Sequence, residues 1–167
     1  MPLLSDYARR KKVEFFFAEI STDEHILEVG CGDGWLRDWC EEHEYEHYLG
    51  LDVRSPADIV GDIRRWRELG LKPASFDVII AFEVVEHVDC FQECYDLLRV
   101  GGRMMVTTPV PERDWLLRIL EAVGLNQPRS TPHDNLVDLQ DVDVFERKEI
   151  VRVGGLSQWA VLHKEPD

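Results

Sequence analysis

Residues Ile26–Gly34 have the types and spacing of a ligand-binding loop. An apolar run that ends at Val29 is followed by glycines at alternate positions, Gly30, Gly32 and Gly34. Glycine has no Cβ, so such a loop can turn sharply and can expose its backbone N–H groups. We therefore expect a buried strand that leads into a loop whose backbone contacts a nucleoside-bearing ligand. A tight turn without a ligand is the alternative.

The spacing of the glycines distinguishes between two kinds of ligand. A dinucleotide-binding loop has the pattern G-x-G-x-x-G, which would require glycine at position 35, where the chain has Trp35. The chain instead has G-x-G-x-G, preceded by Glu28 and containing Asp33. Two acidic side chains are poor neighbours for a pyrophosphate, but they suit a ligand that carries positive charge.

A carboxylate follows at the position where a doubly wound sheet places its ribose contact. Tyr48–Asp52 is predicted to be the second strand, and it ends in Asp52 about twenty residues after the glycine loop. A carboxylate can accept hydrogen bonds from both ribose hydroxyls. Further along, Asp62 precedes Ile63 after a short apolar segment, where it has the type and place of a helix N-cap.

The acidic residue followed by G-x-G-x-G resembles the first motif of the class I S-adenosylmethionine (SAM) methyltransferases, and the chain is most similar to the small methyltransferase-11/23-like domains. The cofactor that this resemblance implies carries a sulfonium and an ammonium cation. In that family an aspartate at the position of Asp62 bonds the adenine amino group, and the next apolar residue packs on the ring. The resemblance implies cofactor contacts from Glu28, Gly30, Cys31, Gly32, Gly34, Asp52, Val53, Asp62, Ile63 and Phe82.

A second group of candidate catalytic residues follows the apolar run Phe76–Phe82. This run is typical of a central parallel strand buried on both faces. The segment F-D-V-I-x-A-F-E-V-V-E-H-V resembles the fourth-motif region of small-molecule O- and C-methyltransferases, where the residues after the strand flank the transferable methyl group. We expect Glu83 and His87 to line the acceptor site, with His87 as the candidate general base. The alternative is that His87 only caps or packs the next helix.

Glu83, Glu86 and His87 also form the pattern E-x-x-E-H, which resembles the metal-binding motif of the small-RNA 3′-terminal 2′-O-methyltransferases. Oxygen and imidazole ligands suit a divalent ion, and His133 is a candidate for a further imidazole. The downstream histidine pair of that family is missing, however, because His133 is followed by Asp134. We therefore predict no bound metal, and we keep a metal-assisted RNA 2′-O-methyltransferase as an alternative.

The composition restricts the partners. The 167 residues carry a net charge of −14, from 33 acidic and 19 basic residues, so the field of the protein repels phosphate backbones. The basic run Arg9–Lys12 is predicted to be a solvated helix face.

Four cysteines without a C-x-x-C pair indicate reduced thiols, and there is no membrane-length apolar run or signal-peptide pattern. We expect a cytoplasmic protein with a small-molecule acceptor, no nucleic-acid partner and no membrane span. The oligomeric state stays open.

The resemblance implies the elements that position these residues. We expect residues 1–167 to form one SAM-dependent methyltransferase domain of α/β class, a Rossmann-like three-layer sandwich. Its seven-stranded, mostly parallel sheet would have the order 3-2-1-4-5-7-6, with strand 7 antiparallel. The leading helix lies within residues 1–20, Gly101 and Gly102 end the helix after the fourth strand, and residues 124–140 form a substrate-side loop. The remaining strands are expected at Ala57–Val60, Arg103–Thr108, Phe145–Val153 and Ser157–His163, and a helix at Pro111–Val123.

Two classes of function fit these observations. The first is an enzyme that transfers the methyl group of SAM to an acceptor by in-line displacement, for which positioning supplies much of the rate. The second is a non-catalytic SAM-binding scaffold, which the short chain and the absence of an inserted lid favour. Formation of S-adenosylhomocysteine distinguishes them, because a scaffold binds SAM without converting it.

Overall fold

The structure, a computed structural model, describes residues 3–111 and 137–166, with side chains from residue 6 onward. Its described strands form one sheet in the order β3-β2-β1-β4-β5-β7-β6. Neighbouring strands from β3 to β5 are parallel, and β7 is antiparallel to both β5 and β6. The expected fold class and strand order are confirmed. The strands are β1 (Ile26–Val29), β2 (Tyr48–Asp52), β3 (Ile59–Val60), β4 (Phe76–Phe82), β5 (Leu98–Pro109), β6 (Arg147–Val153) and β7 (Ser157–His163).

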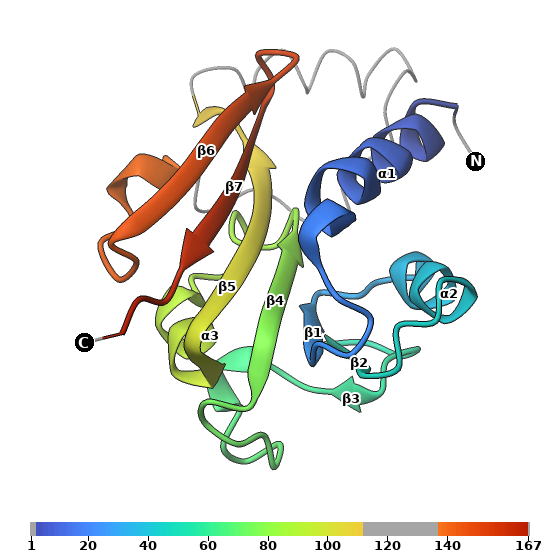
Figure 1. Cartoon of the computed structure of the whole chain (residues 1–167), viewed down its shortest axis with the longest axis vertical. Coiled ribbons are helices and arrows are strands. Elements are labelled where there is room, and N and C mark those ends of the chain that lie inside the picture. Colours follow the sequence, from blue (N-terminus) through green and yellow to red (C-terminus); the bar gives the residue numbers. More distant parts are fainter. Residues whose placement is uncertain (1–2, 112–136, 167) are drawn as a thin grey trace.

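The helices cover the two faces of the sheet, so the sandwich has three layers (Figure 1). Because successive side chains of a strand point to opposite faces, each inner strand contributes to two hydrophobic clusters. Ile79 of β4 belongs to one cluster with residues of α3, and Ile80 belongs to the other with residues of α1 and α2. The helices are α1 (Leu3–Phe16), α2 (Trp35–Glu42) and α3 (Phe91–Leu97), with 3-10 turns η1 (Phe17–Glu19), η2 (Ile63–Arg65) and η4 (Leu139–Asp141).

Most expected boundaries agree with the structure, and the differences are local. The strands β1, β2, β4 and β7 begin and end where the apolar patterns predict. The leading helix ends at Phe16 and continues as the 3-10 turn η1. The third strand is shorter than Ala57–Val60, because only Ile59 and Val60 pair with β2. The predicted helix from Pro111 and most of the predicted 124–140 loop, with His133, lie outside the described residues; at the end of that loop, Leu139 is buried in η4.

The prediction that Gly101 and Gly102 end a helix is wrong. Helix α3 ends at Leu97, and β5 already begins at Leu98, which pairs with Phe76 of β4. Gly101 donates its N–H to the Lys164 carbonyl at 2.8 Å. A Cβ on Gly102 would lie 3.0 Å from the Asp77 carbonyl oxygen, so glycine here permits a close approach of two backbones inside the sheet.

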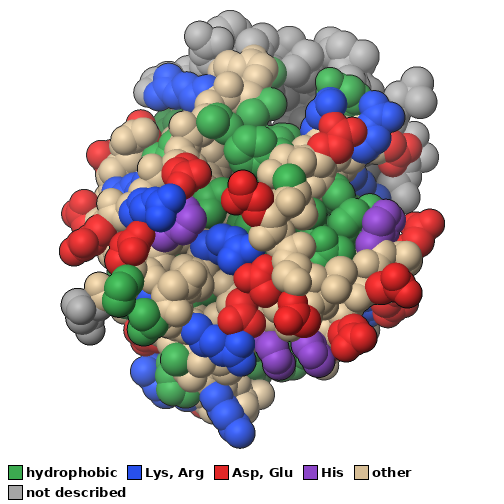
Figure 2. All heavy atoms as spheres, viewed as in Figure 1, with side chains coloured by type: hydrophobic (Ala, Val, Ile, Leu, Met, Phe, Trp, Pro, Cys, Tyr) green, Lys and Arg blue, Asp and Glu red, His purple; other side chains and the backbone are tan. Residues whose placement is uncertain are grey.

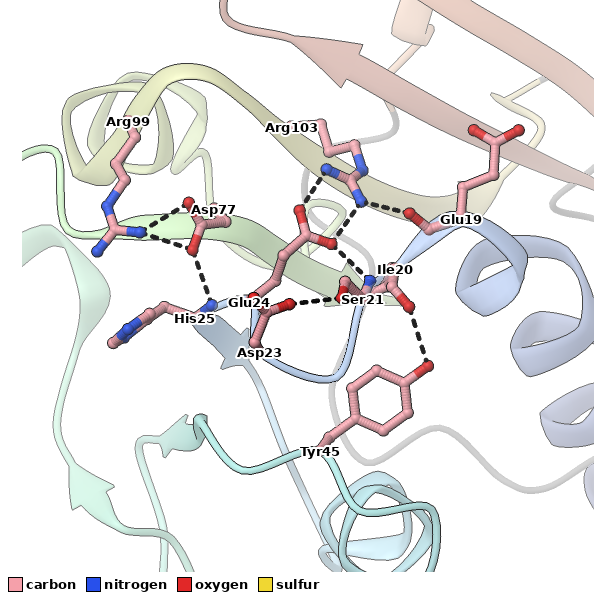
Figure 3. Close-up of polar contacts among 10 residues, drawn as sticks. All are labelled: Glu19, Ile20, Ser21, Asp23, Glu24, His25, Tyr45, Asp77, Arg99 and Arg103. Atoms are coloured by element: carbon pink, nitrogen blue, oxygen red, sulfur yellow. Dashed lines mark hydrogen bonds and ion pairs between the residues drawn. The ribbon is translucent and has the colours of Figure 1, made fainter.

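Ion pairs fasten the connection between α1 and β1 to the sheet (Figure 3). Arg103 of β5 donates to both carboxylate oxygens of Glu24, at 2.8 and 2.9 Å, and to the Glu19 carbonyl at 3.0 Å. Asp77 accepts two bonds from Arg99, each at 2.7 Å, and one from the His25 N–H at 2.8 Å. The connection between α1 and β1 is therefore held against the start of β4, at Asp77, and the middle of β5, at Arg103. None of the described helices is long and apolar enough to cross a membrane.

Candidate cofactor and acceptor site

The glycine loop after β1 has the open backbone that its sequence predicts. Gly30, Gly32 and Gly34 have φ angles of 77°, 53° and 80°. A Cβ on Gly30 would lie 2.4 Å from Cγ2 of Val84, so this glycine is needed for packing against the turn after β4. A Cβ on Gly32 or Gly34 would meet no described atom within 4 Å. Gly32 is exposed, so a ligand can reach the loop there, whereas Gly34 is buried and donates its N–H to the Cys31 carbonyl at 2.9 Å.

Asp52 at the end of β2 holds this loop. Its Oδ2 accepts the Gly32 N–H at 2.9 Å, and its Oδ1 accepts the Arg54 N–H at 3.0 Å. A carboxylate has about four lone-pair positions, so two acceptor positions stay available for hydroxyl groups. The next residue, Val53, is 65% exposed and adds an apolar surface beside the carboxylate. This edge of the sheet can therefore bind a ribose and a flat apolar ring.

Cys31 supports the loop from inside the protein. Its side chain is buried, and its Sγ lies 3.9 Å from the Pro56 carbonyl oxygen. Burial raises the pKa of the thiol to about 11, so the thiol is not a nucleophile at neutral pH. A Cβ on Gly50 would lie 3.1 Å from this sulfur, and the missing side chain thus leaves space for Cys31.

Glu28 lies in β1, just before the glycine loop, and its side chain is buried. The motif alone does not reveal this burial. Its side chain is on the face covered by α2, it is 2% exposed, and it accepts a hydrogen bond from the Tyr48 hydroxyl. Burial raises the pKa of Glu28 to about 7, although the hydrogen bond from Tyr48 and the charge of Arg37 oppose this shift. A direct contact between Glu28 and a cofactor stays a prediction.

Asp62 caps the short helical turn η2. Its Oδ1 accepts the Arg64 N–H at 2.9 Å, which confirms the N-cap interpretation. The side-chain hydrogen bond from Arg64 is the main cause that lowers the pKa of Asp62. Ile63 is 3% exposed and packs in the core with β1 and β4. An adenine contact from Asp62 stays a prediction, and the Ile63 side chain lies in the core.

Glu83 begins the turn after β4 and has two partners. Its Oε1 accepts from Thr107 Oγ1 at 2.8 Å and lies 3.1 Å from Lys12 Nζ of α1. Partial desolvation opposes ionisation of Glu83, but Lys12 and the hydrogen bonds outweigh this effect and lower its pKa. Its φ angle of 57° is uncommon for a residue with a side chain, and such strained residues cluster at functional sites. Glu83 is 43% exposed at its side chain, so this carboxylate can meet a ligand.

Helix α1 covers this edge of the sheet through two basic residues. Lys12 Nζ lies 5.1 Å from the centroid of the half-buried Phe82 ring, in addition to its ion pair with Glu83. Arg9 pairs with Asp33 of the glycine loop at 2.8 Å. The prediction that Arg9–Lys12 is only a solvated face is therefore wrong for these two residues. Sequence reasoning missed them because the first ion pair joins residues 71 positions apart and the second joins residues 24 positions apart.

His87 is exposed in the turn between β4 and α3, and its N–H donates to the Val84 carbonyl at 2.8 Å. The N-cap residue of α3 is Cys90, so His87 does not cap that helix. The role of His87 as a general base stays a prediction. Its place beside Glu83 and Glu86, after the strand that ends at Phe82, is the place that the sequence predicts.

Glu86, the second glutamate of the E-x-x-E-H pattern, is buried. It is 1% exposed, and its Oε2 accepts from Thr108 Oγ1 at 3.2 Å. Burial first, and then the charge of Glu83, raises the pKa of Glu86 to about 8. Within residues 3–111 and 137–166, no group of three or more His, Cys, Asp or Glu side chains is arranged to hold a metal ion. His133 lies outside these residues.

Comparisons with known proteins agree on one family. A family model described as a methyltransferase domain matches residues 5–145. A probable SAM-dependent methyltransferase of Mycolicibacterium smegmatis is 31% identical over 157 residues, which cover 83% of this chain and 59% of the relative. A second protein of that description, from Mycobacterium tuberculosis, is 31% identical over 155 residues, which cover 83% and 56%. The chain thus spans less than three fifths of the length of the curated relatives it matches.

Solved structures show the same fold at low sequence identity. A protein of Pyrococcus horikoshii superposes with a TM-score of 0.67 and 18% identity, covering 96% of this chain and 91% of that one. A geranyl diphosphate methyltransferase in complex with SAM superposes with a TM-score of 0.58 and 14% identity, covering 98% and 88%. From the matched family model, the two relatives and the strand order, this chain belongs to the methyltransferase domain family, in its class I, Rossmann-like form.

Proposed function

We propose that this chain binds SAM at the glycine loop and transfers its methyl group to a small-molecule acceptor in the cytoplasm. The observation that carries the proposal is the contact between the Asp52 carboxylate and the Gly32 N–H, at 2.9 Å. It joins the ribose-binding candidate to Gly32, which is exposed and has open space where a Cβ would lie. The names of the 31% identical relatives support SAM as the cosubstrate.

The residues present fit this cosubstrate. The exposed Gly32 leaves a space that a Cβ would partly fill, and the exposed Val53 beside Asp52 offers an apolar surface to an adenine ring. SAM is a cation at its sulfur and carries a second positive charge at its ammonium group. The side chains of Asp33 and Glu83 are 57% and 43% exposed, so they can meet these charges in addition to their ion pairs with Arg9 and Lys12.

SAM supplies an electrophilic methyl carbon, which bonds to the acceptor nucleophile while the carbon–sulfur bond breaks and the sulfur keeps the electron pair. The protein residues have two tasks in this reaction. The glycine loop and Asp52 orient SAM, and the C-terminal end of β4 presents Glu83 to the acceptor. A hydroxyl or amine acceptor must also lose a proton. Glu83, which is ionised and part exposed, and the exposed His87 are the two candidates to accept it.

The charge of the protein supports a small acceptor over a nucleic acid. Figure 2 shows acidic side chains over much of the face drawn, with basic side chains interspersed among them. Together with the net charge of −14, this distribution repels a phosphate backbone. The metal-assisted alternative requires E-x-x-E-H to act as a ligand set, and the burial of Glu86 against Thr108 does not favour that.

Binding and turnover are tested separately. Calorimetry with SAM and with S-adenosylhomocysteine measures binding, and we expect both to bind. Turnover of methyl-labelled SAM is then followed in fractions of a cell extract, with and without nuclease treatment. Nuclease-resistant label on a small molecule supports the proposal. Binding without any S-adenosylhomocysteine formation would identify a scaffold, and label on RNA would identify the RNA-methylating alternative.

A further inference from the structure

We infer that Glu86 is a neutral carboxylic acid at neutral pH and that it positions the Glu83 carboxylate at the acceptor side of the site. This inference rests on the proposed function only where it places Glu83 at the acceptor side of the site. Its physical content, a protonated buried acid that fixes a neighbouring carboxylate, concerns the described residues alone. Glu86 is thus a positioning residue, since it lies behind Glu83 and not at the surface.

Two consecutive threonines of β5 hold the two carboxyl groups. Thr107 and Thr108 are fully buried at the end of the strand, where their side chains point to opposite faces of the sheet. Thr107 Oγ1 donates to Glu83 at 2.8 Å, and Thr108 Oγ1 donates to Glu86 at 3.2 Å. Each glutamate therefore has its own hydroxyl partner, and each is fixed from a different face of the same strand.

The strained backbone of Glu83 belongs to this arrangement. The Glu83 N–H still pairs with the Thr107 carbonyl at 2.9 Å, so β4 and β5 stay joined up to this residue. The φ angle of 57° then turns the chain, and Glu86 follows three residues later inside the protein. The turn places one carboxyl group at the surface and the other beneath it.

The carboxyl groups of Glu83 and Glu86 have different charges around them. Lys12 of α1 lies 3.1 Å from Glu83 and compensates its negative charge. No ion pair joins Glu86 to any Lys, Arg or His of residues 3–111 and 137–166. Among the described residues, the titratable or polar groups near it are its own backbone N–H, Glu83 at the end of β4 and Thr108 of β5, with His87 next to it in the turn. An ionised Glu86 would therefore be a buried, unpaired anion beside another anion, which is costly.

A proton on Glu86 removes this conflict. The pKa of Glu86 is raised to about 8, by burial and then by Glu83, so the group keeps its proton at pH 7. Against the desolvation of Glu83, the charge of Lys12 and the hydrogen bond from Thr107 are the main causes that lower its pKa, and a hydrogen bond with Glu86 adds to them. The neutral acid thus stabilises the ionised form of Glu83. In the proposed enzyme, the acceptor would meet a single anion of fixed orientation.

Infrared spectroscopy of the protein alone tests the protonation. We expect a carbonyl band of a protonated carboxylic acid at pH 7 that disappears as the pH rises above about 8. The part of this band that belongs to Glu86 should be lost in Glu86→Gln and kept in Glu42→Gln, which alters an exposed glutamate of α2. The part that remains in Glu86→Gln at pH 7 belongs to Glu28, whose pKa is about 7. Glu28→Gln is a second control, because Glu28 also has a raised pKa. A spectrum at pH 7 that Glu86→Gln leaves unchanged would overturn the inference.

The positioning role is tested by the pKa of Glu83, followed by carboxyl NMR during a pH titration. We expect Glu86→Ala to raise this pKa and Glu86→Gln, whose amide still donates, to leave it near the wild-type value. Equal pKa values in the wild type and Glu86→Ala would overturn the positioning role. SAM calorimetry on the same samples tests the proposed function independently, because neither spectroscopic result depends on a bound ligand.

Discussion

The Tyr48 hydroxyl donates a hydrogen bond to the buried carboxyl group of Glu28, from β2 to β1, directly beneath the glycine loop. Tyr48 and Glu28 both point to the face that α2 covers, and α2 begins at Trp35, immediately after the loop. A buried polar pair therefore joins β1 and β2 in the strands that lead to the loop. The burial of Glu28, which raises its pKa, makes the stability of the protein depend on pH.

We expect Glu28→Gln to remove part of this pH dependence. The pKa of Glu28 is about 7 in the folded protein and near 4.5 in the unfolded chain. Below about pH 4.5 both states hold the proton. As the pH rises toward 7, the unfolded state releases its proton first, so the free energy of unfolding falls. The wild type should lose on the order of 3 kcal/mol over this range relative to Glu28→Gln.

Urea unfolding at a series of pH values between 4 and about 8 measures this difference. Glu86 contributes a similar slope to both proteins, so only the difference between them is assigned to Glu28. Parallel curves for the wild type and Glu28→Gln would show that the pKa of Glu28 is the same in the folded and unfolded states, which would contradict the raised pKa.

Asp52→Ala is expected to weaken SAM binding. The change removes the proposed acceptor for the ribose hydroxyls and also the acceptor of the Gly32 N–H. Hydrogen bonds to a charged group contribute about 1.5–3 kcal/mol, which corresponds to about a 10- to 100-fold loss of affinity. Calorimetry measures the change, and Asp52→Asn, which keeps one carbonyl acceptor, should lose less. If folded Asp52→Ala binds SAM as tightly as the wild type, Asp52 does not hold the ribose.

The boundaries of the central strands could be predicted from the sequence because local pattern and burial coincide there. Every residue of β1 is buried, and β4 is a nearly unbroken apolar run. At Leu98–Gly102 the local pattern was misleading. The apolar spacing before Gly101 fits a helix, but the pairing of Leu98 with Phe76 requires an extended chain, and this contact is not visible in local periodicity.

Some residues of the candidate site could likewise be predicted from local sequence patterns, and others could not. The glycine loop, Asp52 and the end of β4 are local motifs, and the structure brings them to one edge of the sheet. Lys12 and Arg9 could not be predicted as site residues, because their partners come from other elements. The one signal for the Glu83–Glu86 arrangement was the pair Thr107-Thr108 at the end of an apolar strand, where polar side chains need buried partners.

Gly32→Val should abolish SAM binding while the sheet still forms. The new side chain would occupy the space in front of the loop, where a Cβ on residue 32 would have no described atom within 4 Å. Its φ of 53° also strains any residue with a side chain. Gly154→Val is the matched control, since Gly154 has a φ of 58°, open space and a place in the β6–β7 turn. Both variants should lose similar stability, and only Gly32→Val should lose SAM.

Calorimetry with SAM and thermal unfolding of the two variants provide the comparison. Retained affinity in Gly32→Val would mean that the loop is not the contact surface for the cosubstrate. Equal loss of affinity in both variants would assign the effect to the destabilised fold, since Gly154 is in a different part of the sheet.

We expect the purified protein to contain no stoichiometric divalent metal ion. Glu83 is engaged by Lys12 and Thr107, and Glu86 is buried against Thr108. A metal ion bound by both glutamates would have to displace the Lys12 ammonium and the proton of Glu86, while His87 is exposed in the turn. Elemental analysis of protein purified without chelator measures the metal content. SAM affinity should also be unchanged by EDTA. A stoichiometric ion that disappears in Glu86→Ala would contradict both this expectation and the neutral state of Glu86, and it would favour the metal-assisted RNA methyltransferase.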